Sequence, residues 1–256
     1  MIYMNKIKDM AYSMLKLATG DKGIERKIND FKLRFPVRWH RYFPKEYEAD
    51  NYGFLEKQVK QGADVIDIGA HIGLFSVRCS QLTGPTGKII AFEPTPGTFS
   101  ILKDTLRINN TGNVVPLQAA VSGDAGMATF YVSHTAGCNS NSLVKNKSEK
   151  ELSAYDVQLY TIDGIVEEYS LKPSLIKIDV EGAELDVLKG GGKTFRELKP
   201  ALILGLHPAF IKQKGDQLES IWQILSEAGY TIKEGGNALT KSDFCSRTIL
   251  FDVQCT

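Results

Sequence analysis

The pattern of apolar and polar residues changes at residue 63. From there, short apolar runs rich in β-branched residues alternate with segments in which apolar residues recur every three or four positions. The apolar runs predict strands at 63–69, 87–94, 113–121, 174–180 and 200–208. The periodic segments predict helices at 74–82, 98–110, 183–190 and 215–230. Strands that alternate with helices are typical of a mostly parallel sheet with helices on both faces, so the predicted fold class is α/β.

Other segments extend this alternation. Residues 127–133 predict an extra strand, and 155–169 predict a strand that runs into a short helix. Residues 231–233 and 247–254 read as two strands joined by a turn, which favours an antiparallel hairpin at one edge of a sheet of about seven strands. Between them, the polar segment 134–150 is long enough to be a lid or a disordered loop.

The first sixty residues differ from the rest. We expect a helical extension at 1–60 that caps a main domain at 61–256. The chain starts with apolar residues alternating with lysines, which indicates an amphipathic helix; attachment to a membrane surface is the less favoured interpretation. The basic and aromatic stretch 34–47 could cover an acceptor pocket, or it could simply pack as part of the cap.

Composition narrows the class of protein. The 256 residues are 43% hydrophobic and 24% charged with a net charge of +1, so nucleic acid or a membrane is not expected as the main partner. The four cysteines form no C-x-x-C pair, which argues against structural zinc or a disulfide framework. No apolar run approaches the ~20 residues of a membrane span, and the cytoplasm is the expected location.

A glycine turn follows the first predicted strand of the main domain. Asp67 ends that strand, and Gly69 and Gly73 lie in the turn into the next helix. In an open parallel sheet, ligands bind beyond the carboxyl ends of the strands. The turn lacks glycines at the third and sixth positions of a dinucleotide fingerprint, and it lacks the Gly-Lys-Ser/Thr of a phosphate loop. The sequence therefore predicts a ligand site without a diphosphate.

An acidic residue also ends the second strand. Glu93 lies 26 residues after Asp67 and is followed by Pro94. A carboxylate there can accept hydrogen bonds from both hydroxyls of a ribose, while Asp67 suits a ligand with positive charge. S-adenosylmethionine has a ribose, a sulfonium and an ammonium, so it meets both conditions. The alternatives are a solvated acid for Asp67 and a helix N-cap for Glu93.

These motifs together resemble a known family. Residues 64–77, 89–110, 117–126 and above all 175–191, with its "KIDVEGAE" core, resemble the FkbM-type class I S-adenosylmethionine-dependent methyltransferases. The resemblance spans roughly 50–255 and implies a Rossmann-like, seven-stranded sheet with an antiparallel last strand. It also implies O-methylation of a hydroxyl on a sugar, polyketide or similar metabolite. His71 stands where the family more often has Asn, and Gln118 and Ala119 fall where such enzymes contact adenine.

An acidic cluster follows the fourth strand. Alternation places Lys177 and Asp179 on one face of that strand, and Glu181 and Glu184 come at or near the start of the next helix. Asp179 is a candidate cofactor ligand and, with Glu181 and His207, a candidate general base for a hydroxyl acceptor. Lys177 and Glu184 are candidate substrate contacts, although acids in a first helical turn also complement the helix dipole.

His207 lies at the end of the next predicted strand. Gly205 stands two residues before it, where the family often has Glu, so the sequence does not support a Glu–His pair. Asp179, Glu181 and His207 could also bind a divalent ion, but their spacing is weak evidence and no metal is predicted.

The sequence thus predicts an S-adenosylmethionine-dependent O-methyltransferase for a small-molecule or glycan hydroxyl. A homodimer is compatible with it. The alternatives are a binding module that retains the cofactor fold without turnover and, less favoured, a nicotinamide-dependent reductase.

Overall fold

The computed structural model describes residues 2–133 and 152–256. The first half of the chain contains α1 (Ile2–Ala18), β1 (Ile24–Ile28), β2 (Phe31–Phe35), the 3₁₀ turn η1 (Val37–Trp39), α2 (Ala49–Gln58), β3 (Asp64–Ile68), α3 (Leu74–Thr83), η2 (Gly84–Thr86), β4 (Lys88–Phe92), α4 (Pro96–Ile108), β5 (Val114–Leu117), β6 (Ala120–Val121) and β7 (Gly126–Ser133). The second half contains β8 (Leu152–Tyr160), α5 (Ile162–Glu168), β9 (Pro173–Asp179), α6 (Glu184–Lys189), α7 (Gly192–Glu197), β10 (Ala201–Leu206), α8 (Pro208–Lys214), α9 (Leu218–Glu227), β11 (Ile232–Glu234), β12 (Asn237–Ala238), α10 (Lys241–Cys245) and β13 (Phe251–Cys255).

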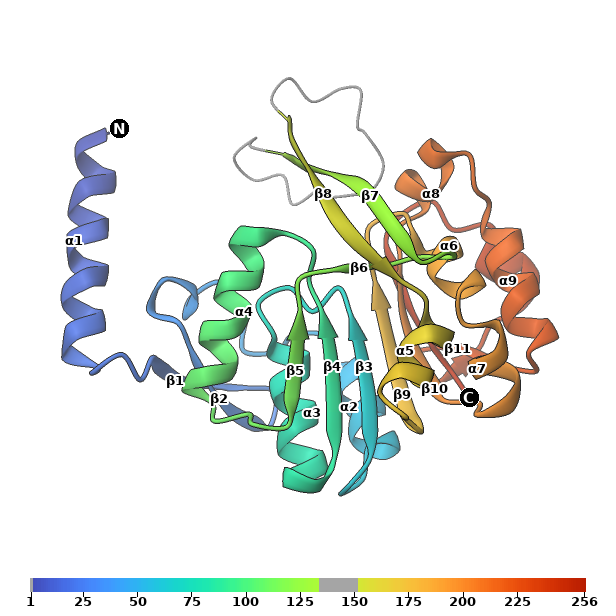
Figure 1. Ribbon diagram of the computed structural model, residues 1–256, viewed down its shortest axis with the longest axis horizontal. Coiled ribbons are helices and arrows are strands. Elements are labelled where there is room, and N and C mark those ends of the chain that lie inside the picture. The colour runs from blue at the N-terminus through green and yellow to red at the C-terminus, as the bar shows by residue number, and fades with distance from the viewer. Residues whose placement is uncertain (1, 134–151) are drawn as a thin grey trace.

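The central sheet has the order β12-β11-β13-β10-β9-β3-β4-β5. Figure 1 shows the part from β10 to β5. The five strands from β10 to β5 are parallel, and β13 runs antiparallel to both β10 and β11. The expected antiparallel last strand is therefore confirmed. The antiparallel pair of β11 and β13 lies at one end of the sheet, as expected. One detail differs from the prediction, because the two-residue β12 adds an eighth strand.

Alternation along the strands creates a core on each face of the sheet. Ile66, Ile90 and Ile176 belong to one apolar cluster, which is completed by α5, α6, α7 and α9. Their neighbours Val65 and Ile89 belong to the other cluster, which is completed by α2, α3 and α4. Because successive side chains of a strand point to opposite faces, strands that are apolar throughout require helices on both sides.

A smaller sheet departs from the sequence prediction. The run 113–121 was expected to form one strand, but it breaks after Leu117 and resumes as β6. β6 then pairs with β8, and β8 pairs with β7, in a separate three-stranded sheet. The strands expected at 127–133 and 155–160 are confirmed. The predicted lid or loop at 134–150 lies outside the described residues.

The extension at 1–60 is not purely helical. Residues 24–35 form an antiparallel hairpin, which the sequence interpretation missed. Part of its signal was present, since apolar and polar residues alternate in 31–35, directly after Asn29 and Asp30. The first arm, Ile-Glu-Arg-Lys-Ile, does not alternate. Phe31, Leu33 and Phe35 are buried in the same cluster as α2 and α3, so the hairpin packs directly on the main domain.

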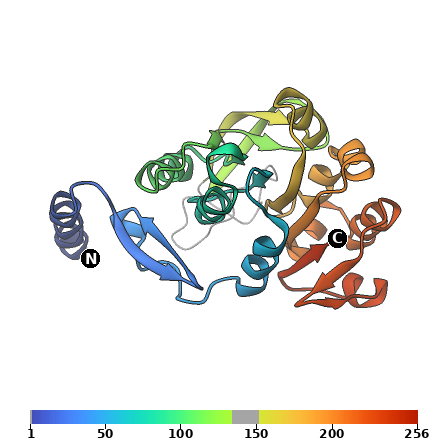
Figure 2. The same ribbon diagram turned by 90° about the horizontal axis from the view of Figure 1, so that it is seen from below.

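The first helix, by contrast, lies away from the central sheet in both views (Figure 1, Figure 2) and contacts η1, where the guanidinium of Arg38 lies over the ring of Tyr12. The hairpin lies between α1 and the sheet in Figure 2. Within the described residues, no helix is long and apolar enough to cross a membrane.

Gly69, which directly follows β3, lies tightly against Asp179, the last residue of β9. Its φ is +80°, and a Cβ there would lie 1.9 Å from the backbone oxygen of Asp179. Gly62 has a similar φ of +78°, but its nearest atom would be 3.5 Å away. The two glycines share the backbone conformation and differ in the space around them.

We therefore expect Gly69→Ala to destabilise the protein more than Gly62→Ala. The left-handed backbone should cost each variant about 1–2 kcal/mol of unfolding free energy, and only Gly69→Ala adds a clash with β9. Urea unfolding of both variants measures the difference. Equal losses of stability in the two variants would contradict this prediction, because they would show that the backbone near Asp179 can shift to accommodate a Cβ at little cost.

Candidate active site

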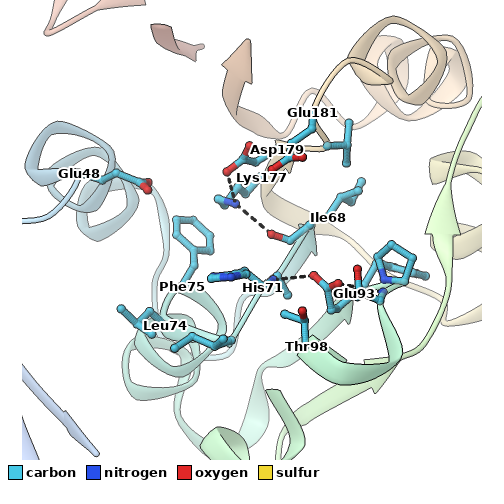
Figure 3. Close-up of a pocket in the computed structure, with 18 of the residues that line it drawn as sticks. Glu48, Ile68, His71, Leu74, Phe75, Glu93, Thr98, Lys177, Asp179 and Glu181 are labelled. Atoms are coloured by element: carbon cyan, nitrogen blue, oxygen red, sulfur yellow. Dashed lines mark hydrogen bonds and ion pairs between the residues drawn. The ribbon is translucent and has the colours of Figure 1, made fainter. Parts of the chain in front are cut away.

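The site lies where the strand order reverses. β4 and β5 follow β3 on one side, and β9 and β10 extend the sheet on the other, so a crevice opens beyond the carboxyl end of β3. A cavity of about 620 Å³ occupies this position. Its wall contains predicted cofactor and catalytic residues together with parts of the N-terminal extension (Figure 3). The predicted residues that line it are Gly69, His71, Gly73, Glu93, Pro94, Ala119, Lys177, Asp179, Glu181 and His207.

The glycine turn and Glu93 form one hydrogen-bonded unit. The backbone N–H of His71 donates to one carboxylate oxygen of Glu93 at 3.0 Å, and the backbone N–H of Thr95 donates to the other at 2.9 Å. His71 has φ +51°, and Figure 3 shows its hydrogen bond with the Glu93 carboxylate. Each carboxylate oxygen retains capacity to accept another hydrogen bond. Glu93 is thus fixed in place and still able to bind a pair of hydroxyls.

Burial has a clear effect on Glu93. It raises the pKa of this carboxyl to about 7, although the two backbone hydrogen bonds and the positive charge of Lys177 act in the opposite direction. Desolvation disfavours the charged form, so burial is the dominant cause. The carboxylate therefore titrates near neutral pH in the protein without ligand.

Lys177 is a positively charged residue of the cavity wall. Its ammonium lies 3.4 Å from Asp179 Oδ2, 3.4 Å from the carbonyl oxygen of Gly69 and 4.0 Å from Asp67 Oδ1. Burial alone would lower the pKa of Lys177, but the charges of Asp179, Asp67 and Glu48 outweigh it and raise that pKa. Lys177 is thus a buried cation that joins the ends of β3 and β9.

Asp67 does not line the cavity. It is fully buried beneath the turn, where Ser76 Oγ donates to its Oδ2 at 2.5 Å. Its Oδ1 has no hydrogen-bond partner among the described residues, and burial raises its pKa against the effect of Lys177 and Ser76. The structure therefore gives Asp67 a supporting position under the turn, in contrast to the direct cofactor contact that we expected.

A second correction concerns His207. The sequence did not support a Glu–His pair, but Nδ1 of His207 lies 2.8 Å from Oε1 of Glu184. Glu184 is fully buried and absent from the cavity wall, so its expected contact with substrate is wrong. The partner carboxylate comes from the first residue of α6 and not from β10, so the spacing along β10 could not reveal it.

Gln118 also departs from its expected position. It is exposed in the bend between β5 and β6 and does not line the cavity, whereas its neighbour Ala119 does. Phe92 and Val121 line the cavity as well, which gives it an apolar section. Such a surface suits the flat ring system of a base.

Aromatic side chains from the extension complete the wall. Trp39, Tyr42 and Phe43 surround the His71 ring, with centroid distances of 5.9, 6.3 and 6.4 Å. Burial and the nearby Lys177 lower the pKa of His71, which keeps the imidazole neutral among these rings. The stretch 34–47 thus both packs on the domain and lines the cavity.

The hairpin turn holds the end of this aromatic segment. Asn29 donates through Nδ2 to the carbonyl oxygen of Tyr47 at 2.9 Å and accepts from the Tyr47 N–H at 3.1 Å. Tyr47 lines the cavity next to Glu48. The hairpin that the sequence interpretation missed therefore positions part of the site.

Two acidic residues of the wall were not predicted. Glu48 precedes α2 with φ +45°, and Asp252 lies on β13 opposite Gly205. Asn51 Nδ2 donates to Asp252 Oδ2 at 3.0 Å and lies 3.3 Å from Glu48 Oε2. Burial and the charges of Glu48 and Asp179 raise the pKa of Asp252 to about 6. The available signal was a single acid inside the apolar run of β13.

Comparison with known proteins identifies the family. The family defined as "Methyltransferase FkbM domain" matches residues 67–232. The chain belongs to the FkbM methyltransferase family. This FkbM family chain is 31% identical to methyltransferase sdnD of Sordaria araneosa, over 59% of this chain and 72% of that one. It is also 29% identical to the hexuronic acid methyltransferase AglP of Haloferax volcanii, over 71% of this chain and 69% of that one.

A solved structure supports the fold. The crystal structure of methyltransferase FkbM from Methylobacillus flagellatus aligns with 77% of this chain and 44% of its own, with a TM-score of 0.50 and 19% identity. The FkbM family chain therefore has the class I methyltransferase fold, as the sequence predicted.

The residues of the cavity fit S-adenosylmethionine, the cofactor that this fold implies. Glu93 offers a fixed carboxylate for the ribose, and Ala119 and Phe92 offer an apolar wall for the base. Asp179 lies in the acidic part of the cavity wall, which suits the positively charged part of the cofactor. Among the described residues, no group of three His, Cys, Asp or Glu side chains is arranged to hold a metal ion.

The pKa of Glu93 leads to a prediction about cofactor binding. A ribose donates hydrogen bonds best to the ionised carboxylate, so binding should require loss of a proton below about pH 7. We expect the affinity for S-adenosylhomocysteine to rise by up to about tenfold per pH unit as pH increases toward 7, and to level off above it. Calorimetry across this range measures the effect.

Glu93→Gln is the matched control. It should bind at least about tenfold more weakly at pH 8, because a charge-assisted hydrogen bond is lost, and its affinity should lack the rise toward neutral pH. A variant that keeps the wild-type pH dependence would remove Glu93 from the cofactor site.

Lys177 leads to a prediction about stability. Lys177→Met leaves Asp67 as a buried and uncompensated carboxyl, so we expect it to lower the free energy of unfolding by about 3–5 kcal/mol. Lys189→Met is the control, because its ion pair with Asp186 is exposed and should contribute less than about 1 kcal/mol. Adding Asp67→Asn to Lys177→Met should recover part of the loss in urea unfolding. A small loss for Lys177→Met alone would contradict this role.

Proposed function

We propose that the protein is an S-adenosylmethionine-dependent O-methyltransferase that acts on a hydroxyl of a small metabolite or sugar. The observation that supports it best is that one cavity joins a fixed acceptor carboxylate, Glu93, to the edge that carries Asp179 and His207. The first group suits a nucleoside, and the second suits removal of a proton from a hydroxyl. The match to the FkbM family supports the same reaction.

Each part of the cavity has a role in this proposal. Glu93 binds the ribose, and the turn at Gly69–Gly73 allows the backbone to approach the ligand. When bound, S-adenosylmethionine supplies an electrophilic methyl group on a sulfonium centre. Asp179 and Glu181 provide negative charge near the cationic end of the cofactor, while Lys177 holds Asp179 in place.

The protein's contribution to the rate is mainly position and proton removal. Trp39, Tyr42 and Phe43 cover one side of the cavity and limit the access of water. Holding two reactants in line can supply a large part of the rate enhancement. Because a neutral hydroxyl is a poor nucleophile, a base at the β9–β10 edge completes the site.

The charges in the wall restrict the acceptor. Glu48, Asp179, Glu181 and Asp252 are all acidic, so a carboxylate on the acceptor would meet repulsion close to them. The relative AglP is named as a hexuronic acid methyltransferase. We propose that the acceptor here is instead neutral or cationic near its reacting hydroxyl, with several hydroxyls to donate to these carboxylates and a ring face for Trp39 or Tyr42.

Two measurements test the function. Calorimetry should detect binding of S-adenosylhomocysteine, and NADH serves as a control ligand that should not bind. Transfer of labelled methyl from S-adenosylmethionine should then favour neutral and amino sugars or polyketide hydroxyls over uronic acids. No binding of S-adenosylhomocysteine would refute the cofactor. Binding with label transferred only to uronic acids would refute the acceptor class.

A further inference from the structure

Glu184 is a fully buried acid near the site, and cofactor binding does not account for it. Its side chain is 0% exposed, and it is the first residue of α6. Its Oε1 accepts the backbone N–H of Gly182 at 3.0 Å and faces His207 Nδ1 at 2.8 Å. Its Oε2 has no hydrogen-bond partner within residues 2–133 and 152–256. Burying a carboxylate costs free energy of folding. The presence of this carboxylate beside the imidazole therefore needs an explanation.

The local backbone brings the two side chains together. After Asp179 the chain turns through Glu181 at φ +52° and Gly182 at φ +105°, and α6 then begins. A Cβ on Gly182 would lie 2.7 Å from Cβ of Phe210, so the turn packs tightly against α8. Phe210 in turn stacks on the His207 ring at a centroid distance of 6.1 Å. The imidazole is thus held by a ring on one side and by Glu184 at its edge.

The hydrogen bond decides the tautomer of the neutral ring. An ionised carboxylate only accepts hydrogen bonds, so Nδ1 of His207 must carry the proton that lies between it and Glu184. The other nitrogen, Nε2, then has a free lone pair. Since His207 lines the cavity and Nε2 lies 3.7 Å from Asp179 Oδ1, this lone pair is at the edge where the acceptor hydroxyl is expected.

Building on the proposed function, we propose that His207 is the general base and that Glu184 is the positioning residue that fixes its tautomer and supports its positive charge. The step is a proton transfer. The O–H bond of the acceptor breaks, its proton moves to Nε2, and its electron pair stays on the oxygen as the new O–CH₃ bond forms. The pair of the broken carbon–sulfur bond goes to sulfur, and the proton on Nε2 later passes to solvent.

Asp179 is less suited to this role. It is paired with the ammonium of Lys177, whereas Nε2 of His207 has no neighbouring cation in the described contacts. Burial alone would lower the pKa of His207, but the hydrogen bond that the ring donates to Glu184 and the charges of Glu184, Asp179 and Glu181 outweigh burial and raise that pKa. A further acid lies on the neighbouring strand: Asp252 of β13 is opposite Gly205, and its carboxylate is hydrogen-bonded to Asn51.

The pH profile of Glu184→Gln tests the positioning role. An amide can still accept from Nδ1, but the negative charge is lost, so the pKa of His207 should fall. The acidic limb of kcat/KM should move to lower pH by about one unit, and kcat should fall by about tenfold or more. Glu184→Asp should keep the limb near its wild-type position, since it restores the charge. Neither variant should change the affinity for S-adenosylhomocysteine.

Two comparisons complete the kinetic test. His207→Ala should lose about 10²- to 10⁴-fold in kcat with unchanged cofactor affinity. Asp186→Asn is the control for α6, because it breaks the ion pairs of this helix with Lys189 of α6 and Lys214 of α8 without touching the imidazole. It should leave the limb in place. An unshifted limb in Glu184→Gln, with activity lost only in proportion to the unfolded fraction, would overturn the proposal.

A measurement on the wild-type protein does not depend on folding of the variants. The ¹⁵N chemical shifts of the His207 ring, assigned by their absence in His207→Ala, should show Nδ1 protonated at pH above the pKa. A ring protonated on Nε2 would overturn the assignment. If S-adenosylhomocysteine fails to bind, the proposed function fails while the tautomer is still measured. If it binds and the ring is protonated on Nε2, only the role of the pair fails.

Discussion

The site depends on the ion pairs that the buried ammonium of Lys177 makes with two carboxylates. This ammonium lies between Asp67 at the end of β3 and Asp179 at the end of β9, two strands that meet where the sheet order reverses. A buried pair of this kind need not add net stability relative to an apolar core, but removing one member leaves an uncompensated charge. The arrangement therefore fixes the two strand ends relative to each other. The glycine turn and Asp179 are both bonded to this ammonium.

From this junction the site divides into two parts with different chemistry. On the β4 side, Glu93 is fixed by two backbone N–H groups and the wall becomes apolar toward Ala119. On the β10 side, carboxylates surround the imidazole of His207. Figure 3 shows Glu93 and the acidic group of Asp179 and Glu181 on opposite sides of the Lys177–Ile68 region. A ligand that has a neutral ribose at one end and a cation at the other matches this division.

The N-terminal extension belongs to the site as well as to the core. Its hairpin packs into the apolar cluster beside α2 and α3, and Asn29 in the hairpin turn holds Tyr47. Trp39, Tyr42 and Phe43 then enclose the ring of His71. An aromatic residue or histidine at position 71 gains these contacts, which a shorter side chain such as Asn would not make. This gives a physical reason for the imidazole at the position where the family resemblance implied Asn.

The sequence by itself determined the order in which the central strands and helices follow one another along the chain, because apolar runs and helical periodicity are local properties. It also located the turn at Gly69, Glu93 and the acidic segment after Lys177, since each is a polar or flexible break directly after an apolar run. The tertiary structure alone decided which side chains meet. Glu184 pairs with His207 across 23 positions and Asn51 with Asp252 across 201, and no local pattern encodes such contacts. It also places Asp67 beneath the turn, because its strand is buried on both faces. In the part of the chain that the structure describes, that side chain contacts Ser76 and Lys177.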